Sequence, residues 1–161
     1  MNNLKHLLTR PLRAVPNSLV IFVLIIALIG FADSTYLVIE HYQGVIPPCS
    51  IIGGCELVLT SVYASIIGIP VSLLGAIYYF IILVGAFAYL DTKKTEILKW
   101  AMLFTVFGIL ASLWFVFLQV FIIKSYCVYC LGSVMTSTIL FVTACVVFKK
   151  YKVNDQISMI Q

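Results

Sequence analysis

Four long apolar runs, separated by short polar segments, dominate the chain. They extend roughly from Leu19 to Ile39, from Ile69 to Leu90, from Trp100 to Ile123 and from Tyr129 to Phe148. A helix needs about 20 apolar residues to cross a bilayer, so each run is long enough to span one. The pattern predicts an all-α membrane protein, with residues 1–161 forming one domain built as a bundle of four transmembrane helices.

Composition supports a lipid environment and excludes a nucleic-acid partner. Hydrophobic residues make up 63% of the chain and charged residues 10%, whereas a soluble domain carries about 25% charged residues. The net charge is +4. The basic residues gather at the ends of the apolar runs, so no continuous basic face is available for nucleic acid.

The placement of Lys and Arg orients the bundle. Basic residues precede the first run, separate the second from the third and follow the fourth: Lys5, Arg10, Arg13, Lys93, Lys94, Lys99, Lys149, Lys150 and Lys152. Residues 40–68 contain no Lys or Arg, and the turn before the fourth run contains only Lys124. By the positive-inside rule, both termini are cytoplasmic and these two loops lie outside the inner (plasma) membrane. The first run is too long for a cleaved signal peptide, and no clear A-x-A site follows it.

Two cysteine pairs fall in the two outer loops. Cys127 and Cys130 form a C-x-x-C motif at the start of the fourth run, where a helix N-terminus stabilises a thiolate. Cys130 lies one turn deeper, at the membrane boundary, where it can meet an apolar oxidant dissolved in lipid. Redox chemistry is one interpretation of this motif. The alternatives are inert packing of apolar cysteines and a zinc site, for which this spacing is unusual.

The first pair, Cys49 and Cys55, flanks a segment ending in Gly53-Gly54. The glycines permit a loop that opens and closes a disulfide with little strain. A purely structural disulfide is the alternative, since most disulfides outside the cytosol are structural. The presence of a second cysteine pair on the same side of the membrane favours thiol–disulfide exchange between the two pairs. Cys145 lies fifteen residues beyond Cys130, about 22 Å along a helix, and we interpret it as a packing residue.

The half-apolar segment from Glu56 to Ala64 is too short to span the membrane. We expect it to form a short interfacial helix that caps the active site and keeps water from Cys130. An ordinary interfacial loop is the alternative.

Several motifs in chain order resemble the bacterial homologues of vitamin K epoxide reductase. The matching elements are Ser34-Thr35-Tyr36-Leu37, His41-Tyr42, Pro48-Cys49-Ser50, Gly54-Cys55-Glu56, Ser61, Gly68-Ile69-Pro70 running into Ser72 to Tyr79, and Tyr126 to Cys130. The resemblance extends from about Gly30 to Val134, and the ordered set is far more specific than an isolated C-x-x-C.

The resemblance implies a role for each matching residue. Cys130 is expected to react with a membrane quinone, either ubiquinone or menaquinone, and Cys127 to exchange with Cys55. Cys49 is expected to exchange with an external thiol protein, and Ser61 to support the active site. Many bacterial homologues carry a fused thioredoxin-like domain, and none follows within this chain, so the expected partner is a separate thioredoxin-like protein of the DsbA type.

The chain departs from the vertebrate pattern at two positions. Where that branch carries an Asn and a Tyr thought to hydrogen-bond the vitamin K head, this chain has Val71 and Val134. These departures leave epoxide reduction open, whereas simple quinone reduction is expected.

The expected activity is that of a quinone-dependent, disulfide-forming oxidoreductase with no metal. A structural membrane subunit with stapling disulfides, and a DsbB-type oxidase, are the alternatives. In DsbB the C-x-x-C precedes the spaced pair, which is the reverse of the order here. Candidate quinone-binding residues are Asp33, Tyr36, Tyr78, Trp114, Phe115 and Gln119. Asp33 suggests either a proton route or a simple interfacial carboxylate, and aromatic residues at helical spacing are equally typical of packing.

Overall fold

In the computed structural model, which describes residues 15–45, 54–66 and 68–157, each apolar run forms one long helix. Helix α2 covers Asn17–Gln43, α4 covers Val71–Thr92 and α5 covers Thr95–Phe117. A π-helical turn, η1 (Leu118–Ile123), continues α5, and α6 covers Val128–Ile157. The predicted fold of four membrane-spanning helices is confirmed, and the described helices extend beyond most of the predicted boundaries.

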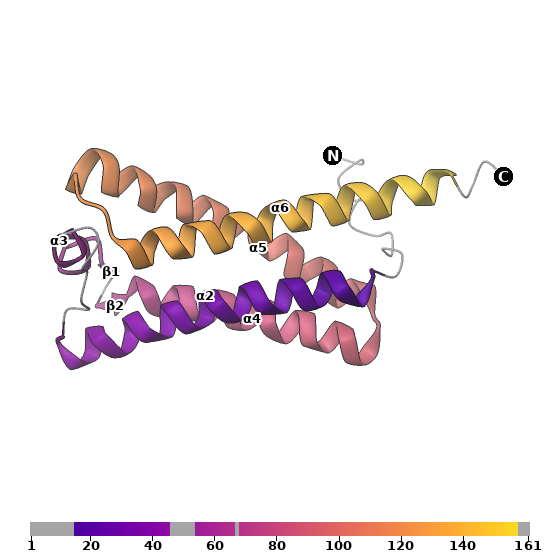
Figure 1. The fold of residues 1–161 in the computed structure, drawn as a ribbon, viewed down its shortest axis with the longest axis horizontal. Coiled ribbons are helices and arrows are strands. Elements are labelled where there is room, and N and C mark those ends of the chain that lie inside the picture. Colours follow the sequence, from indigo (N-terminus) through magenta and orange to yellow (C-terminus); the bar gives the residue numbers. More distant parts are fainter. Residues whose placement is uncertain (1–14, 46–53, 67, 158–161) are drawn as a thin grey trace.

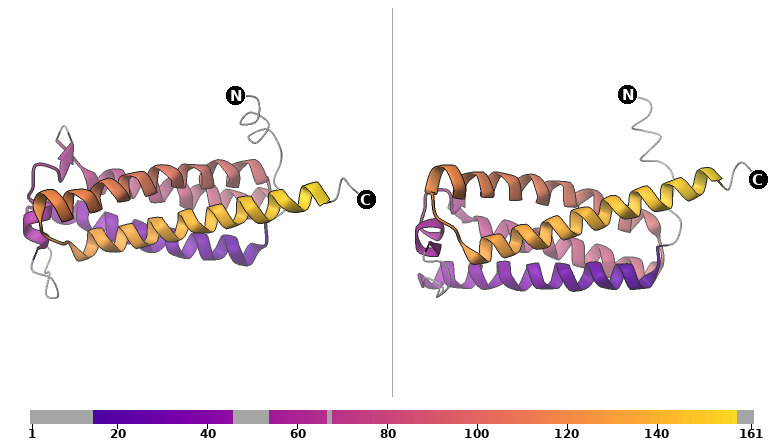
Figure 2. Two further views of the ribbon diagram at one scale, coloured as in Figure 1. Left: turned by 90° about the horizontal axis from the view of Figure 1, so that it is seen from above. Right: turned by 45° about the horizontal axis from the view of Figure 1, so that its top comes forward.

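The four long helices form a ring in which each packs on two neighbours. Helix α2 packs against α4 and α6, and α5 packs against the same two helices from the other side. Figures 1 and 2 show them running side by side along the long axis. Small residues permit close approach, as membrane helix packing requires: a Cβ at Gly85 would lie 2.7 Å from the Cβ of Ala101.

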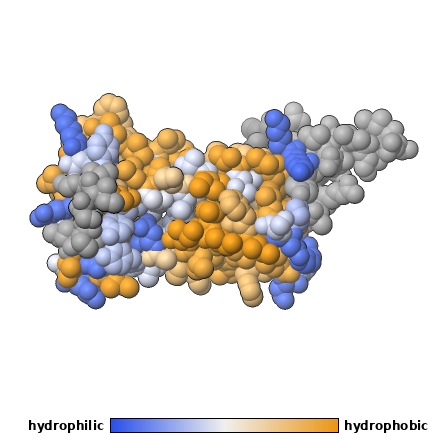
Figure 3. Space-filling view, viewed as in Figure 1, coloured by the Kyte–Doolittle hydropathy of each residue, from blue (hydrophilic) through white to orange (hydrophobic). Residues whose placement is uncertain are grey.

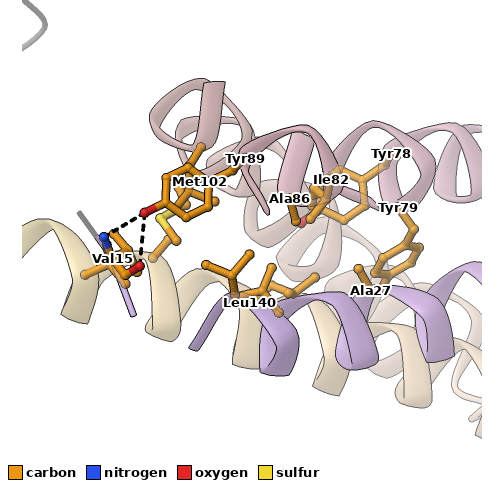
Figure 4. Packing of buried hydrophobic residues seen from close by; sticks show 14 residues of the cluster. Val15, Ala27, Tyr78, Tyr79, Ile82, Ala86, Tyr89, Met102 and Leu140 are labelled. Atoms are coloured by element: carbon orange, nitrogen blue, oxygen red, sulfur yellow. Dashed lines mark hydrogen bonds between the residues drawn. The ribbon is translucent and has the colours of Figure 1, made fainter. Parts of the chain in front are cut away.

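The core lies between the helices and is anchored by tyrosines (Figure 4). The hydroxyl of Tyr89 donates to the carbonyl of Val15 (3.0 Å) and accepts from its N–H (2.8 Å). The hydroxyl of Tyr79 lies 2.6 Å from that of Thr136 and donates to the carbonyl of Ser133 (2.9 Å). Because a buried polar group in lipid is costly without a partner, the Tyr79 bonds hold α4 against α6, and the Tyr89 bonds hold α4 against the residue that leads into α2.

The outer surface has the polarity of a membrane protein. Apolar side chains cover the middle of the face in Figure 3, and hydrophilic side chains gather at its two ends. Lys93, Lys94 and Lys149 lie at the end of the bundle where α4 meets α5 and α6 emerges. The short helix α3 (Cys55–Leu59) lies at the opposite end, which we call the cysteine end.

Two short strands complete the cysteine end. Strands β1 (Ser65–Ile66) and β2 (Ile69–Pro70) pair antiparallel, with Ser65 opposite Pro70. Gly68 makes the reversal possible with a φ of +79°, a conformation that only glycine adopts readily. The second apolar run was predicted to begin at Ile69, but Ile69 and Pro70 pair in this hairpin and α4 begins at Val71.

The capping helix is present but short. Helix α3 has five residues and ends where two side chains bond back to the main chain. The hydroxyl of Thr60 donates to the carbonyl of Glu56, and that of Ser61 to the carbonyl of Val58, both at 2.7 Å. Such local bonds compete with helix continuation, so the stretch beyond Leu59 turns toward β1 instead of extending the predicted helix to Ala64.

Candidate active site

The two cysteine motifs meet at the cysteine end of the bundle. Cys55, Val58 and Cys127 form one buried cluster, and Cys130 packs against it. Cys55 is disulfide-bonded, whereas Cys127, Cys130 and Cys145 are free thiols. Cys49 lies outside the described residues.

A close approach of two backbones creates this cluster. A Cβ at Gly54 would lie 2.8 Å from the carbonyl oxygen of Tyr126 and 2.9 Å from its nitrogen. Gly54 directly precedes Cys55, and Tyr126 directly precedes Cys127. The missing side chain at Gly54 therefore lets the start of α3 lie against the residues that lead into α6.

Cys127 occupies the N-cap position of α6. Its carbonyl accepts the N–H of Leu131 at 3.0 Å, which is the first bond of the helix, and its sulfur accepts the N–H of Cys130 at 3.4 Å. An N-cap side chain normally provides an oxygen for this donor, so here the sulfur of Cys127 acts as the capping group.

These surroundings change the acidity of the Cys127 thiol. A hydrogen bond from the side chain of Cys130 is the largest influence, and it lowers the pKa of Cys127 from 9.0 to about 7. Burial of the thiol works in the opposite direction, and main-chain N–H groups of Cys130 and Tyr129 lower the pKa further. Cys127 is thus prepared to act as a thiolate near neutral pH.

The π-helical turn η1 brings Gln119 to the same motif. The Oε1 atom of Gln119 accepts the N–H of Cys127 at 3.1 Å, and its carbonyl accepts the N–H of Ser125 at 3.2 Å. The turn ends at Lys124 in a left-handed conformation, with φ of 55°. The two bonds fold the connection back, so that α6 starts beside the end of α5.

A cavity of about 740 Å³ opens between the helices below this motif. Its lining includes Cys130 and five of the residues selected from the sequence: Ser61, Tyr78, Trp114, Phe115 and Gln119. Val71 and Val134, the two departures from the vertebrate pattern, also line it. Two lining residues, Leu74 (45% exposed) and Trp114 (57% exposed), lie partly on the outer surface of the bundle, so the wall of the cavity extends to the apolar outer surface.

Asp33 and Tyr36, the remaining candidates, are not among the residues that line the cavity. Asp33 accepts a hydrogen bond from the hydroxyl of Ser133 at 2.8 Å, and Ser133 lines the cavity. The ring of Tyr36 packs against that of Tyr129, with centroids 5.5 Å apart. Ser133 therefore connects Asp33 to the lining of the cavity.

Cys145 corrects one expectation. It was interpreted as a packing residue, but its side chain is exposed on α6. On a helix with apolar residues all round, sequence periodicity does not tell a lipid-facing position from an interior one.

Sequence reasoning missed Ser133 and Glu40. Ser133 follows Cys130 by three residues, a spacing that places both on one side of a helix, and this spacing was available as a signal. Glu40 lines the cavity with its Oε2 atom buried and without a partner in the described part of the chain, and nothing in the sequence singled it out.

In the same described ranges, no three His, Cys, Asp or Glu side chains gather as metal ligands would.

The structure is a bundle of helices long enough to span a membrane. Its free thiols lie between a disulfide-bonded cysteine and a cavity whose wall extends to the apolar surface. This combination is typical of membrane-bound oxidoreductases. The chain belongs to the vitamin K epoxide reductase family, whose sequence profile matches residues 21–145. The comparison with curated proteins gave no match.

Proposed function

We propose that the protein is a quinone-dependent thiol oxidoreductase that reoxidises a separate thioredoxin-like protein of the DsbA type and so supports disulfide formation. Electrons would pass from Cys49 and Cys55 to Cys127 and Cys130, and then to ubiquinone or menaquinone. The observation that carries the proposal is the position of Cys130, which lines the cavity while packing against the cluster of Cys55 and Cys127.

The thiol steps balance as exchange reactions. A partner thiolate attacks the Cys49–Cys55 disulfide at Cys49, and a second partner thiol resolves the mixed disulfide, leaving the partner oxidised and the loop pair reduced. Cys55 then attacks the Cys127–Cys130 disulfide at Cys127 and releases Cys130. Cys49 attacks Cys55 in turn, which restores the first disulfide and leaves two thiols at the C-x-x-C. The buried cluster of Cys55 with Cys127 supports this order, and the rates depend on thiolate fraction and access.

The last step moves two electrons to the quinone. Cys127 and Cys130 become a disulfide, and the quinone becomes a hydroquinone after taking up two protons. The Ser133 hydroxyl, bonded to Asp33, offers a proton route from the cavity to a carboxyl group, which is the role we propose for Asp33. Ser61, Tyr78, Trp114 and Phe115 would shape the ring site, as lining residues of this cavity.

The proposal also includes the orientation of the helix bundle in the membrane. Lys93, Lys94, Lys149 and Lys150 lie toward the end of the bundle opposite the cysteine end. By the positive-inside rule that end would face the cytoplasm, and thiol exchange would take place outside the plasma membrane, where disulfide formation is supported.

The direct test is quinone reduction by the purified protein. Full-length protein in detergent is mixed with a reduced DsbA-type protein and with ubiquinone or menaquinone, and quinone absorbance is followed. We expect absorbance to fall with the unaltered protein and with the control Cys145→Ala, and to stay constant with Cys130→Ala. A constant signal from the unaltered protein with both quinones would contradict the proposal.

A further inference from the structure

Gln119 has an unused hydrogen-bond donor beside the C-x-x-C. Its side chain is 1% exposed, and its Oε1 atom accepts the N–H of Cys127 at 3.1 Å. Its Nε2 atom is buried and has no hydrogen-bond partner in the described residues. The residue lines the cavity that also contains Cys130.

The direction of this amide follows from chemistry. The Cys127 N–H is a donor, so the atom that it meets has to be the oxygen of the Gln119 amide, and the NH₂ group has to point the other way. A buried NH₂ without an acceptor is costly, because it has given up its bonds to water. A ligand that provides an acceptor in the cavity removes that cost.

We propose that Nε2 of Gln119 donates a hydrogen bond to one carbonyl oxygen of the bound quinone and so holds the ring in register with Cys130. The inference rests on the proposed function and deepens it by assigning one donor to one ligand atom. Gln119 would then touch the substrate with its nitrogen and the N-cap cysteine of α6 with its oxygen.

Three other polar groups that line the cavity are less suited to this task. The hydroxyl hydrogens of Ser61 and Ser133 already go to the Val58 carbonyl and to Asp33. The Tyr78 hydroxyl also has no hydrogen-bond partner within the described ranges. It lies against Gly108, which precedes Gln119 by eleven residues, or about 16 Å along a helix. That hydroxyl is too deep to serve a carbonyl held next to Cys130.

The bond would act on the reaction as well as on binding. Negative charge develops on the quinone oxygens as electrons arrive, and a donor fixed in a dry site stabilises that charge. Because the same amide holds the Cys127 N–H, the position of the ring and the position of the C-x-x-C are set by one side chain. The π-helical turn makes this possible, and such turns are frequent at functional sites.

The test replaces the amide by an apolar side chain of similar length. For Gln119→Met in full-length protein, we expect the KM for quinone to rise about tenfold, as for loss of a buried hydrogen bond. Infrared spectra of quinone labelled with ¹³C at one carbonyl at a time should show one carbonyl stretch at lower wavenumber in the unaltered protein, and Gln119→Met should abolish that shift. Phe121→Leu, which alters an exposed residue of the same turn, is the matched control and should change neither quantity.

A second variant covers the possibility that Gln119→Met does not fold. Gln119→Glu keeps an oxygen for the Cys127 N–H but offers no donor when ionised, which its infrared carboxylate band reports. It should lose the carbonyl shift as well. Variants that keep both the KM for quinone and the carbonyl shift would overturn the inference. If only the turnover fell, Gln119 would act on Cys127 alone, and the inference would again fail. A protein that reduces neither quinone and binds neither with a shifted carbonyl contradicts the proposed function, and the inference with it.

Discussion

At the scale of single residues, the two cysteines of the C-x-x-C have different surroundings. Cys127 is fully buried in the cluster with Cys55 and caps a helix, whereas Cys130 is half-buried and lines the cavity. The sulfur of Cys127 accepts the main-chain N–H of Cys130, so the reduced motif is arranged to hold negative charge on its outer sulfur. This asymmetry suits a pair in which one thiol exchanges with protein and the other meets a membrane substrate.

The acidity of Cys127 gives a prediction for pH dependence. Because its pKa is lowered to about 7, its thiolate should be absent well below that pH, half formed near it and complete above it, instead of forming near the ordinary value of 9.0. Ultraviolet absorbance of the thiolate, taken as the difference between the reduced protein and Cys127→Ser, measures this directly. Cys130→Ala removes the largest lowering influence and should move the midpoint upward. An unchanged midpoint would show that Cys130 is not the cause.

The sequence alone predicted which residue types lie at the site but not their contacts. The position of each pair at a loop, and its place relative to the basic residues, is enough to expect Cys55, Cys127 and Cys130 at one end. The bond from the Cys127 N–H to Gln119 depends on a π-helical turn, for which the apolar run from Trp100 to Ile123 contains no signal. Gln119 was therefore a candidate for a different reason, as a polar residue in a membrane helix.

At the scale of elements, the arrangement of α3 against the entry to α6 decides whether the two motifs can exchange. Thiol exchange needs sulfur to approach sulfur closely and in line, and small displacements of reacting groups reduce rates steeply. The contact between Gly54 and the backbone of Tyr126 is the feature that brings α3 to this position. The nearest atoms belong to the main chain, so they cannot move aside as a flexible side chain would.

We predict that Gly54→Ala separates the two motifs. Transfer from the reduced partner to the C-x-x-C should slow by on the order of tenfold to a hundredfold, because the added methyl group would push α3 away from Tyr126. Quinone reduction driven by a small dithiol that reduces Cys127 and Cys130 directly should remain. The control is Gly132→Ala, where an added Cβ meets nothing within 4 Å. Equal loss with both reductants would mean that the substitution damages the fold.

The long helices were predictable because lipid requires a continuous apolar run of a set length. The short elements were not. Helix α3 and the β1–β2 hairpin are held by local bonds such as those of Thr60 and Ser61 and by packing on the bundle end, and neither leaves a periodic pattern in a stretch of so few residues. The Ile69-Pro70 pair shows the difficulty, since proline fits a helix start and a strand end equally well.

At the scale of the whole molecule, the apolar band separates two chemically different ends (Figure 3). One end holds the cysteine cluster, α3 and the hairpin, and the other holds the lysines between α4 and α5 and those near the end of α6. The cavity reaches from the cysteine end toward lipid-exposed residues such as Leu74 and Trp114. In the proposed function, a water-soluble thiol protein and a lipid-soluble oxidant would therefore use the same site from different directions.

This arrangement predicts which end faces out. Val62 is 82% exposed at the cysteine end, and Lys150 is exposed at the other, so each accepts a reporter without disturbing the core. In a background with Ser at all five native cysteines, Val62→Cys should react with a membrane-impermeant maleimide on intact cells, and Lys150→Cys should react only after lysis. The lysines favour this outcome because the membrane potential and anionic lipids retain positive loops in the cytoplasm. The reverse pattern would place the thiols in the reducing cytosol, where a disulfide-forming relay has no outlet, and the proposed function would fail even if the isolated protein reduced quinone.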